Sequence, residues 1–251
     1  MHRAQGVVDR LLQGLASGAI SSRSLSAAEA ATLAASLRDD ARDAIYSGAL
    51  SIAEAIQGID RNLFTWTTVK LYYSVFYLTR AALGLNGIGV VYPEKTPYAW
   101  TATAGSTPVK RSGTTHKAVL DAFRLYRANS IFLSQKIGAE DPFNWLMVRR
   151  ESANYKVPKF CEPSAPDHFR FIGKHGVRRP VRDYIADEQH LFTFDPDHAM
   201  LAFPIAVLKQ LLDELKKSSV GGFSREDGNF LASQFFDATG PLPEFRKLIV
   251  S

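Results

Sequence analysis

The sequence predicts a mostly α-helical protein, a helical bundle with a short β-hairpin or extended insertion and additional N- and C-terminal helices. Three observations carry this prediction. The first 60 residues are rich in Ala and Leu, residues 62–85 form a long aromatic run with helical periodicity, and residues 86–113 alternate aromatic, threonine and small residues. With 251 residues, 46% of them hydrophobic, the chain can bury a substantial core.

The chain divides by composition into three parts. Residues 1–60 predict N-terminal helices that pack on the core, and residues 61–160 predict a helical bundle that carries the insertion 86–113. Residues 161–251 predict a loop-rich segment followed by C-terminal helices. The insertion is longer than an ordinary connection between helices, which favours a functional or interaction loop.

A capping box marks the start of one N-terminal helix. Ser26 is a suitable N-cap because Glu29 follows three residues later and Ala/Leu helix formers come after it. We expect this helix to end at Ser47-Gly48, because glycine disfavours the helix interior. A further short helix is expected over residues 51–59.

The segment 62–85 gives the clearest helical prediction. Its apolar side chains cover more than one face, so we expect a central helix that is buried on most sides. Asn86-Gly87 is expected to end it. The apolar and aromatic positions are Trp66, Val69, Leu71, Tyr72, Val75, Phe76, Leu78, Ala82 and Leu83.

The rest of the chain alternates helical and loop patterns. Pro142 is well placed for the first turn of a helix, and residues 158–180 read as loop because they are rich in proline, glycine and charge. Asp195 or Asp197 is expected to cap the helix that follows. Helices are predicted from about residue 114 and over residues 142–155, 197–217 and 224–236.

Composition limits the class of protein. Cys161 is the single cysteine, so an intramolecular disulfide and a cysteine-cluster zinc site are excluded. The N-terminus lacks the apolar core and cleavage pattern of a signal peptide, and no run approaches the roughly 18 apolar residues of a membrane-spanning helix. We therefore expect a cytoplasmic protein with no membrane partner.

Three segments carry a family resemblance: residues 72–83 (YYSVFYLTRAAL), 115–117 (THK) and 150–155 (RESANY). In this order they resemble the HEPN superfamily of helical domains. In that family a helix with the pattern Tyr-Tyr-x-x-Phe-x-x-x-Arg-Ala-Leu, a helix start with His-Lys or His-Ser, and a terminal Arg-x-x-Ala-x-Tyr helix recur. The resemblance covers about residues 62–160.

The resemblance implies a bundle of four or five helices, frequent dimerisation and, in many members, metal-independent RNA cleavage by an Arg-x4–6-His motif. Arg150 matches the arginine of that motif, but Tyr155 occupies the position that matches the histidine. A phenol is a poorer general base than an imidazole at neutral pH. The sequence therefore leaves open whether the site catalyses by altered chemistry or only binds phosphate.

If the protein cleaves RNA, we expect Arg150 to stabilise charge on the phosphate. Tyr155, Asn154 or His116 would supply polar contacts or proton transfer. Most of these residues also have a purely structural interpretation. Arg149 and Arg150 would form a solvated or salt-bridging helix end, Tyr155 would be a packing tyrosine, and His116 would be a histidine at a helix start.

Basic residues gather between residues 110 and 159, although the whole chain has a formal net charge of only +5. This clustering favours an anionic ligand, and Tyr98 and Trp100 would offer stacking surfaces for bases. A second basic cluster at 178–182 either extends this surface or is loop charge. The predicted nucleic-acid-binding residues are Lys110, Arg111, Lys117, Arg124, Arg127, Arg149, Lys156 and Lys159.

A literal Arg-x4-His pattern occurs at Arg170 and His175, but Gly173 and the neighbouring prolines argue against the helix that would present both side chains together. Phosphate-loop, dinucleotide-binding and His-Glu-x-x-His motifs are missing from the sequence. We therefore expect neither a metal site nor a cofactor.

The leading hypothesis is a cytoplasmic HEPN-like protein that binds or cleaves RNA without a metal, or binds a nucleotide. The resemblance alone implies a role in a prokaryotic antiviral defence or toxin-antitoxin system. The competing hypothesis is a non-catalytic HEPN-like scaffold that holds a partner protein or forms a homodimer.

Overall fold

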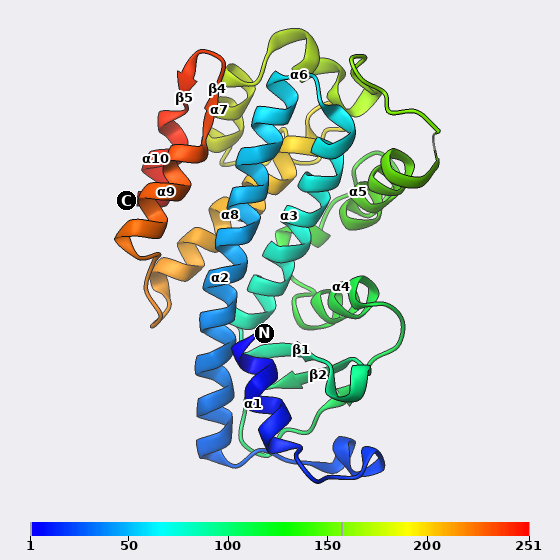
Figure 1. The fold of residues 1–251 in the computed structure, drawn as a ribbon, viewed down its shortest axis with the longest axis vertical. Helices are drawn as coiled ribbons and strands as arrows, with labels where there is room; N and C mark the ends of the chain where they lie inside the picture. The colour runs from blue at the N-terminus through cyan, green and yellow to red at the C-terminus, as the bar shows by residue number, and fades with distance from the viewer. Residues whose placement is uncertain (1, 157, 251) are drawn as a thin grey trace. The chain divides into compact units, whose positions relative to one another are not determined.

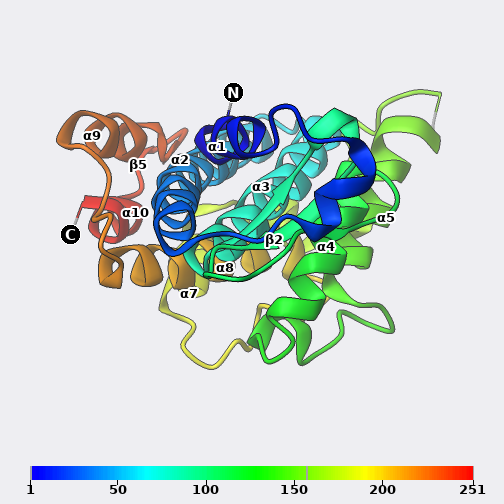
Figure 2. The ribbon, with the colours of Figure 1, turned by 90° about the horizontal axis from the view of Figure 1, so that it is seen from below.

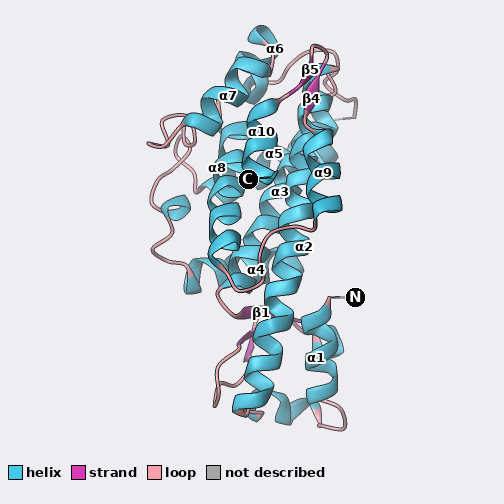
Figure 3. Ribbon diagram, turned by 90° about the vertical axis from the view of Figure 1, so that its left-hand side faces the viewer, coloured by secondary structure: helices cyan, strands magenta, loops and turns pink. Residues whose placement is uncertain are grey.

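The computed structural model describes residues 2–156 and 158–250, and most of them are helical. Two long helices, α2 (Ala27–Asp60) and α3 (Phe64–Leu85), lie side by side (Figure 1). The strands form a three-stranded antiparallel sheet and a separate two-stranded hairpin, and Figure 3 shows how little of the fold they occupy. The prediction of a mostly α protein with a short β insertion is confirmed. Within the described residues, every helix is too short or too polar to cross a membrane.

The chain forms two compact units, and α2 and α3 each contribute residues to both. Each unit is assembled from separate stretches of sequence. The first contains Met1–Ala44, Leu78–Ala128 and Glu214–Gly221, and the second contains Ile45–Tyr77, Asn129–Asp213 and Gly222–Ser251.

The first unit is built around the three-stranded sheet, whose order is β1-β2-β3. Both α1 and α4 pack against β1. Figure 2 shows α1 lying against α2. Besides parts of α2, α3 and α8, the elements of this unit are α1 (Arg3–Leu11), a 3-10 helix (Ser17–Ser22), β1 (Ile88–Val91), a 3-10 helix (Pro93–Lys95), β2 (Tyr98–Thr101), β3 (Val109–Lys110) and α4 (Thr115–Tyr126).

Trp100 lies at the centre of the core of the first unit. It is fully buried in one apolar cluster with Val8, Leu33 and Tyr98, and its Nε1 donates to the Ser106 carbonyl at 3.2 Å. Tyr98 and Trp100 are two residues apart on β2, so their side chains leave the same face of the sheet and enter this core. The prediction that these two rings offer stacking surfaces is therefore wrong.

The start of α2 follows the predicted capping box. The Ser26 amide donates to Glu29 Oε2 at 2.8 Å, and the Glu29 amide donates to Ser26 Oγ at 3.3 Å. The hydrogen bond from the Ser26 amide, followed by that from the Arg23 side chain, lowers the pKa of Glu29 to about 2. The predicted N-cap is confirmed.

The predicted end of this helix at Ser47-Gly48 is wrong, because α2 continues to Asp60. Ile45, Ala49 and Ile52 are fully buried on both sides of the glycine. Tertiary packing of this apolar face outweighs the propensity cost of one glycine, which is about 1 kcal/mol.

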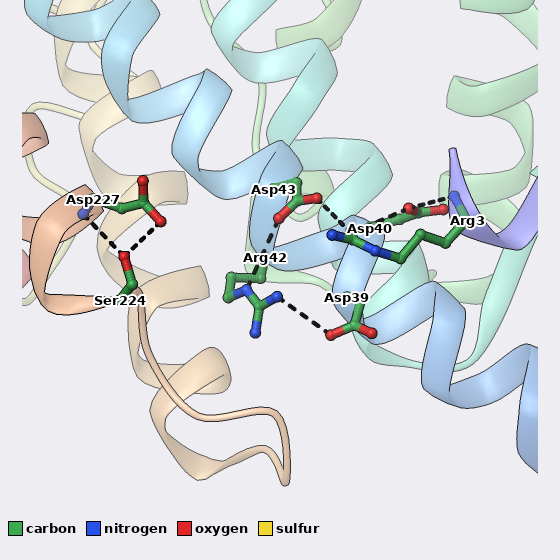
Figure 4. Close-up of polar contacts among 7 residues, drawn as sticks. All are labelled: Arg3, Asp39, Asp40, Arg42, Asp43, Ser224 and Asp227. Carbon is green, nitrogen blue, oxygen red and sulfur yellow. Dashed lines mark hydrogen bonds and ion pairs between the residues drawn. The ribbon is translucent and has the colours of Figure 1, made fainter. Parts of the chain in front are cut away.

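An acidic side chain of α2 caps the N-terminus of α1 (Figure 4). Asp40 accepts hydrogen bonds from the backbone amides of Arg3 at 2.8 Å and Ala4 at 2.9 Å. The Arg3 guanidinium donates to Asp43 at 2.5 Å. Asp40 thus satisfies two of the amides that a helix N-terminus leaves without partners.

Glycines allow α2 and α3 to approach closely. In the first unit, a Cβ on Gly84 would lie 2.7 Å from the Leu37 carbonyl oxygen. In the second unit, a Cβ on Gly58 would lie 2.3 Å from Thr67 Oγ1. Side chains at these two positions would push the helices apart.

The second unit is helical apart from the small hairpin β4-β5. The predicted first-turn proline of α5, Pro142, is confirmed, and Ser224 caps α9 by accepting from the Asp227 amide at 3.0 Å (Figure 4). Besides parts of α2 and α3, its elements are a 3-10 helix (Ile131–Leu133), α5 (Pro142–Glu151), a π-helical turn (Ser152–Lys156), a 3-10 helix (Asp167–Phe169), α6 (Arg170–His175), α7 (Arg178–Ala186), most of α8 (Ala199–Lys217), α9 (Arg225–Gln234), β4 (Phe236–Asp237), β5 (Gly240–Pro241) and α10 (Pro243–Val250).

Three features of the second unit differ from the prediction. The segment expected to be loop contains α6 and the start of α7, and the C-terminal tail forms a hairpin and α10. The tail is ordered by packing, since the rings of Phe235 and Phe245 are fully buried and stack 3.8 Å apart. Trp66 was expected to be buried in the central helix, but it is 52% exposed because the first turn of α3 presents it to solvent.

Candidate functional site

Arg150 lies near the end of α5 and is surrounded by tyrosines. Its Nη2 donates to Tyr73 Oη at 3.0 Å. Its guanidinium carbon lies 5.4 Å from the ring centroid of Tyr72, 5.5 Å from that of Tyr73 and 5.3 Å from that of Tyr155. All three distances are within the range of cation–π attraction. We call these four residues the Arg150 cluster.

The π-helical turn Ser152–Lys156 brings Tyr155 to this cluster. In a regular α-helix, side chains five residues apart point about 140° away from each other. A π-helical turn instead pairs residues five apart, and such turns are frequent at functional sites. Tyr155 is 69% exposed, so its interpretation as a packing tyrosine is wrong. Tyr155 is the exposed ring among the three that lie around Arg150.

The positive charge of Arg150 is not neutralised by any carboxylate that the structure describes. Among residues 2–156 and 158–250, Arg150 forms no ion pair, and its buried Nε has no hydrogen-bond partner. The interpretation of Arg150 as a salt-bridging residue is therefore wrong. An arginine held between rings, with donors left over, is suited to bind an oxyanion such as phosphate.

Tyr72 is not available as a general base at neutral pH. Burial raises the pKa of Tyr72 to about 12, although the charge of Arg150 acts in the opposite direction. The Tyr72 phenol therefore stays protonated at neutral pH. Asn154, which was also expected to contribute, is half-buried in the π-helical turn.

Arg149 has a different environment from its neighbour. Its guanidinium lies over the Trp145 ring at 3.7 Å from the centroid and donates to Glu140 at 3.2 Å. Burial lowers the pKa of Arg149, while Glu140 acts to raise it. Because Glu140 neutralises Arg149, the two consecutive arginines are not equivalent anion sites.

Arg149 lines a pocket of about 530 Å³ between α3, α5 and the segment around His168. Glu140, Asp167 and Asp197 also line it, so carboxylates outnumber the one arginine. The pocket is large enough for a small ligand, but its charge does not favour an anion.

The side chain of His168 lies within this pocket and is held by α3. Its Nε2 is 3.1 Å from Thr68 Oγ1, and the Thr68 hydroxyl donates to the Phe64 carbonyl at 2.9 Å. Since the one hydroxyl hydrogen is used, Nε2 has to carry the hydrogen and Nδ1 is left as an acceptor. Burial, followed by the charge of Arg149, lowers the pKa of His168 to about 4. Nothing in the sequence singles out His168, because its environment depends on tertiary packing.

We expect this histidine to make stability depend on pH. An unfolded histidine has a pKa near 6.5, so the unfolded chain takes up the proton first as the pH falls. The contribution of the neutral His168 side chain to stability is complete above about pH 6.5 and is lost as the pH falls towards about 4. Between pH 7 and pH 5, the free energy of unfolding should fall by about 1–2 kcal/mol more in the wild type than in His168→Asn.

Urea unfolding at the two pH values measures this difference. Carboxylates that titrate in the same range are common to both proteins and cancel in the comparison. Equal losses of stability in the wild type and in His168→Asn would contradict the assigned neutral state of His168.

Several of the predicted site residues belong to the first unit. His116 is half-buried at the second position of α4, as expected for a histidine at a helix start. Lys117 pairs with Asp121 at 2.6 Å. The other predicted cations of this unit are exposed Lys110, Arg111 beside the Tyr126 ring at 5.8 Å, Arg124 paired with Asp121 at 3.5 Å, and Arg127 paired with Glu214 at 3.0 Å.

The literal Arg-x4-His pair lies on α6, so the prediction that this segment is not helical is wrong. The two side chains still differ in direction. Arg170 pairs with Asp167, whereas the His175 ring contacts Phe171 at a centroid distance of 4.7 Å. Five residues on an α-helix separate the two by about 140°, so they do not form a joint site.

No protein-family model, curated protein or solved structure matches this chain. Function therefore has to be argued from the chemistry of the site. In the part of the chain that the structure describes, no group of three or more His, Cys, Asp or Glu side chains is arranged to hold a metal ion. The Arg150 cluster is the strongest candidate because it combines exposed aromatic surface with a cation that has no carboxylate partner in the described part of the chain.

Proposed function

We propose that this protein is a HEPN-like RNA-binding protein and that the Arg150 cluster takes up an RNA phosphate. The observation that carries the proposal is the guanidinium of Arg150, which is held by one tyrosine hydroxyl and three rings and pairs with no carboxylate among residues 2–156 and 158–250. Such a group provides charge-assisted hydrogen bonds to a phosphate. The exposed ring of Tyr155 adds a surface for a neighbouring base or ribose.

Binding is favoured over cleavage by the composition of the cluster. The residues that contact Arg150 are tyrosines, and an efficient general base at neutral pH needs a pKa near 7. Burial leaves the Tyr72 phenol far from that value, with a pKa of about 12. A role in prokaryotic defence or in a toxin-antitoxin system, and the cytoplasmic location, stay proposals that rest on the resemblance.

The test is binding of a fluorescently labelled single-stranded RNA in buffer with a metal chelator. We expect Arg150→Ala to weaken binding by roughly 10- to 100-fold, because a hydrogen bond to a charged group contributes about 1.5–3 kcal/mol. Arg246→Ala is the matched control, since it removes the same charge from an exposed position on α10. Equal affinities of Arg150→Ala and wild type would contradict the proposal.

The same samples distinguish binding from cleavage and from the scaffold hypothesis. We expect the RNA to stay intact on a denaturing gel. Cleavage that disappears in Arg150→Ala would instead establish a metal-independent ribonuclease. Absence of RNA or nucleotide binding, together with a stable dimer or a complex with a partner protein, would favour the scaffold.

A further inference from the structure

Two aromatic side chains form an exposed pair on the second unit, apart from the residues of the Arg150 cluster. Trp66 in the first turn of α3 is 52% exposed, and Phe160 is 48% exposed. Their ring centroids lie 6.1 Å apart with an angle of 85° between the planes. The other two tryptophans, Trp100 and Trp145, are 0% and 2% exposed. Clustered exposed rings of this kind mark a binding surface more often than a lone exposed residue does.

The pair is held in place by its surroundings. Thr65, next to Trp66, donates from its amide and its hydroxyl to the carboxylate of Glu162, both at 2.7 Å. Glu162 is two residues after Phe160, so these bonds fix the segment that carries Phe160 against the start of α3. The surface therefore exists before a ligand binds, which reduces the entropy cost of binding.

Exposed basic residues lie close to the two rings in sequence. Arg61, Lys156 and Lys159 are exposed and, within the described residues, form no ion pair. Of the carboxylates nearby in the sequence, Glu162 is already engaged by Thr65, and Asp60 is exposed. Exposed rings with exposed basic residues close by in sequence match the flat bases and the backbone charge of a single-stranded nucleic acid.

We propose that Trp66 and Phe160 form a stacking platform for bases of single-stranded RNA, with Lys159 and Arg61 contacting the adjoining phosphates. The choice of RNA rests on the proposed function, but the residues are different from those of the Arg150 cluster. Because every base has a face that can stack, the platform should tolerate different sequences.

Trp66 provides its own spectroscopic readout, since it is the exposed one of the three tryptophans. Addition of oligouridylate to the wild type should quench the tryptophan fluorescence. When one base can no longer stack, the affinity falls by roughly 5- to 100-fold. We therefore expect Trp66→Ala and Phe160→Ala to bind the RNA more weakly by this factor, and Trp66→Tyr to bind it with near wild-type affinity. Phe230→Ala is the control, because Phe230 is also 50% exposed but lies on α9.

Unchanged affinity in Trp66→Ala, or binding without quenching in the wild type, would overturn the platform. A fluorescence change that depends on protein concentration and not on RNA would also overturn it, because a second copy would then cover Trp66. The Arg150 proposal can fail separately. Arg150→Ala protein with wild-type affinity and normal quenching would refute the Arg150 site and support the platform.

Discussion

Replacement of Trp100 by alanine is expected to lower the free energy of unfolding by about 3–5 kcal/mol. The indole is completely buried between the sheet and the helices of the first unit, and its Nε1 donates to the Ser106 carbonyl. Alanine leaves a large cavity and removes one of the two hydrogen bonds that the Ser106 carbonyl accepts, the other coming from the Leu25 amide, and both changes destabilise the folded state. Urea unfolding followed by circular dichroism measures the change.

Trp66→Ala is the control for this experiment, since it makes the same chemical change at a side chain that is 52% exposed. We expect Trp66→Ala to lower the free energy of unfolding by less than about 1 kcal/mol. Similar losses in the two variants would contradict the position assigned to Trp100.

Replacement of Arg178 by alanine is expected to lower the free energy of unfolding of the second unit by about 3 kcal/mol. Its guanidinium donates to both carboxylate oxygens of Asp237, at 2.6 and 3.0 Å, and to the carbonyls of Gly240 and Pro241. Burial alone would raise the pKa of Asp237, but hydrogen bonds from Arg178 and Thr239 lower it below its usual value. Without Arg178, a buried carboxylate loses its cation.

Arg179→Ala is the matched control, because Arg179 is the next residue of α7 and its side chain is 84% exposed. It should change stability by less than about 0.5 kcal/mol. If Arg178→Ala loses stability because the charge of Asp237 is left unpaired, adding Asp237→Asn should restore part of the lost stability. A double variant that is less stable than Arg178→Ala would contradict this explanation.

Local signals in the sequence predicted where helices begin better than where they end. The capping residue Ser26 and the first-turn proline Pro142 act through neighbouring backbone groups, so the sequence alone identifies them. Gly48 was expected to break a helix, yet the buried residues around it hold α2 together. Long-range packing of that kind has no local signature.

At the candidate site, too, local features could be predicted from the sequence and long-range contacts could not. Arg150 was identified from its motif, but its neighbour Tyr155 reaches it only through a π-helical turn that the spacing does not reveal. The cluster at 178–182 was expected to be a binding surface or loop charge, whereas Arg178 forms a structural ion pair. Its partner Asp237 is 59 residues away in sequence, so the pairing could not be foreseen.

The salt dependence of RNA binding tests the central claim, that Arg150 contacts an RNA phosphate, most directly. For single strands, the slope of log affinity against log salt concentration changes by about 0.7 for each neutralised phosphate. We predict that Arg150→Ala has a slope about 0.7 shallower than the wild type and that Arg246→Ala keeps the wild-type slope. Parallel lines for the wild type and Arg150→Ala would contradict the account.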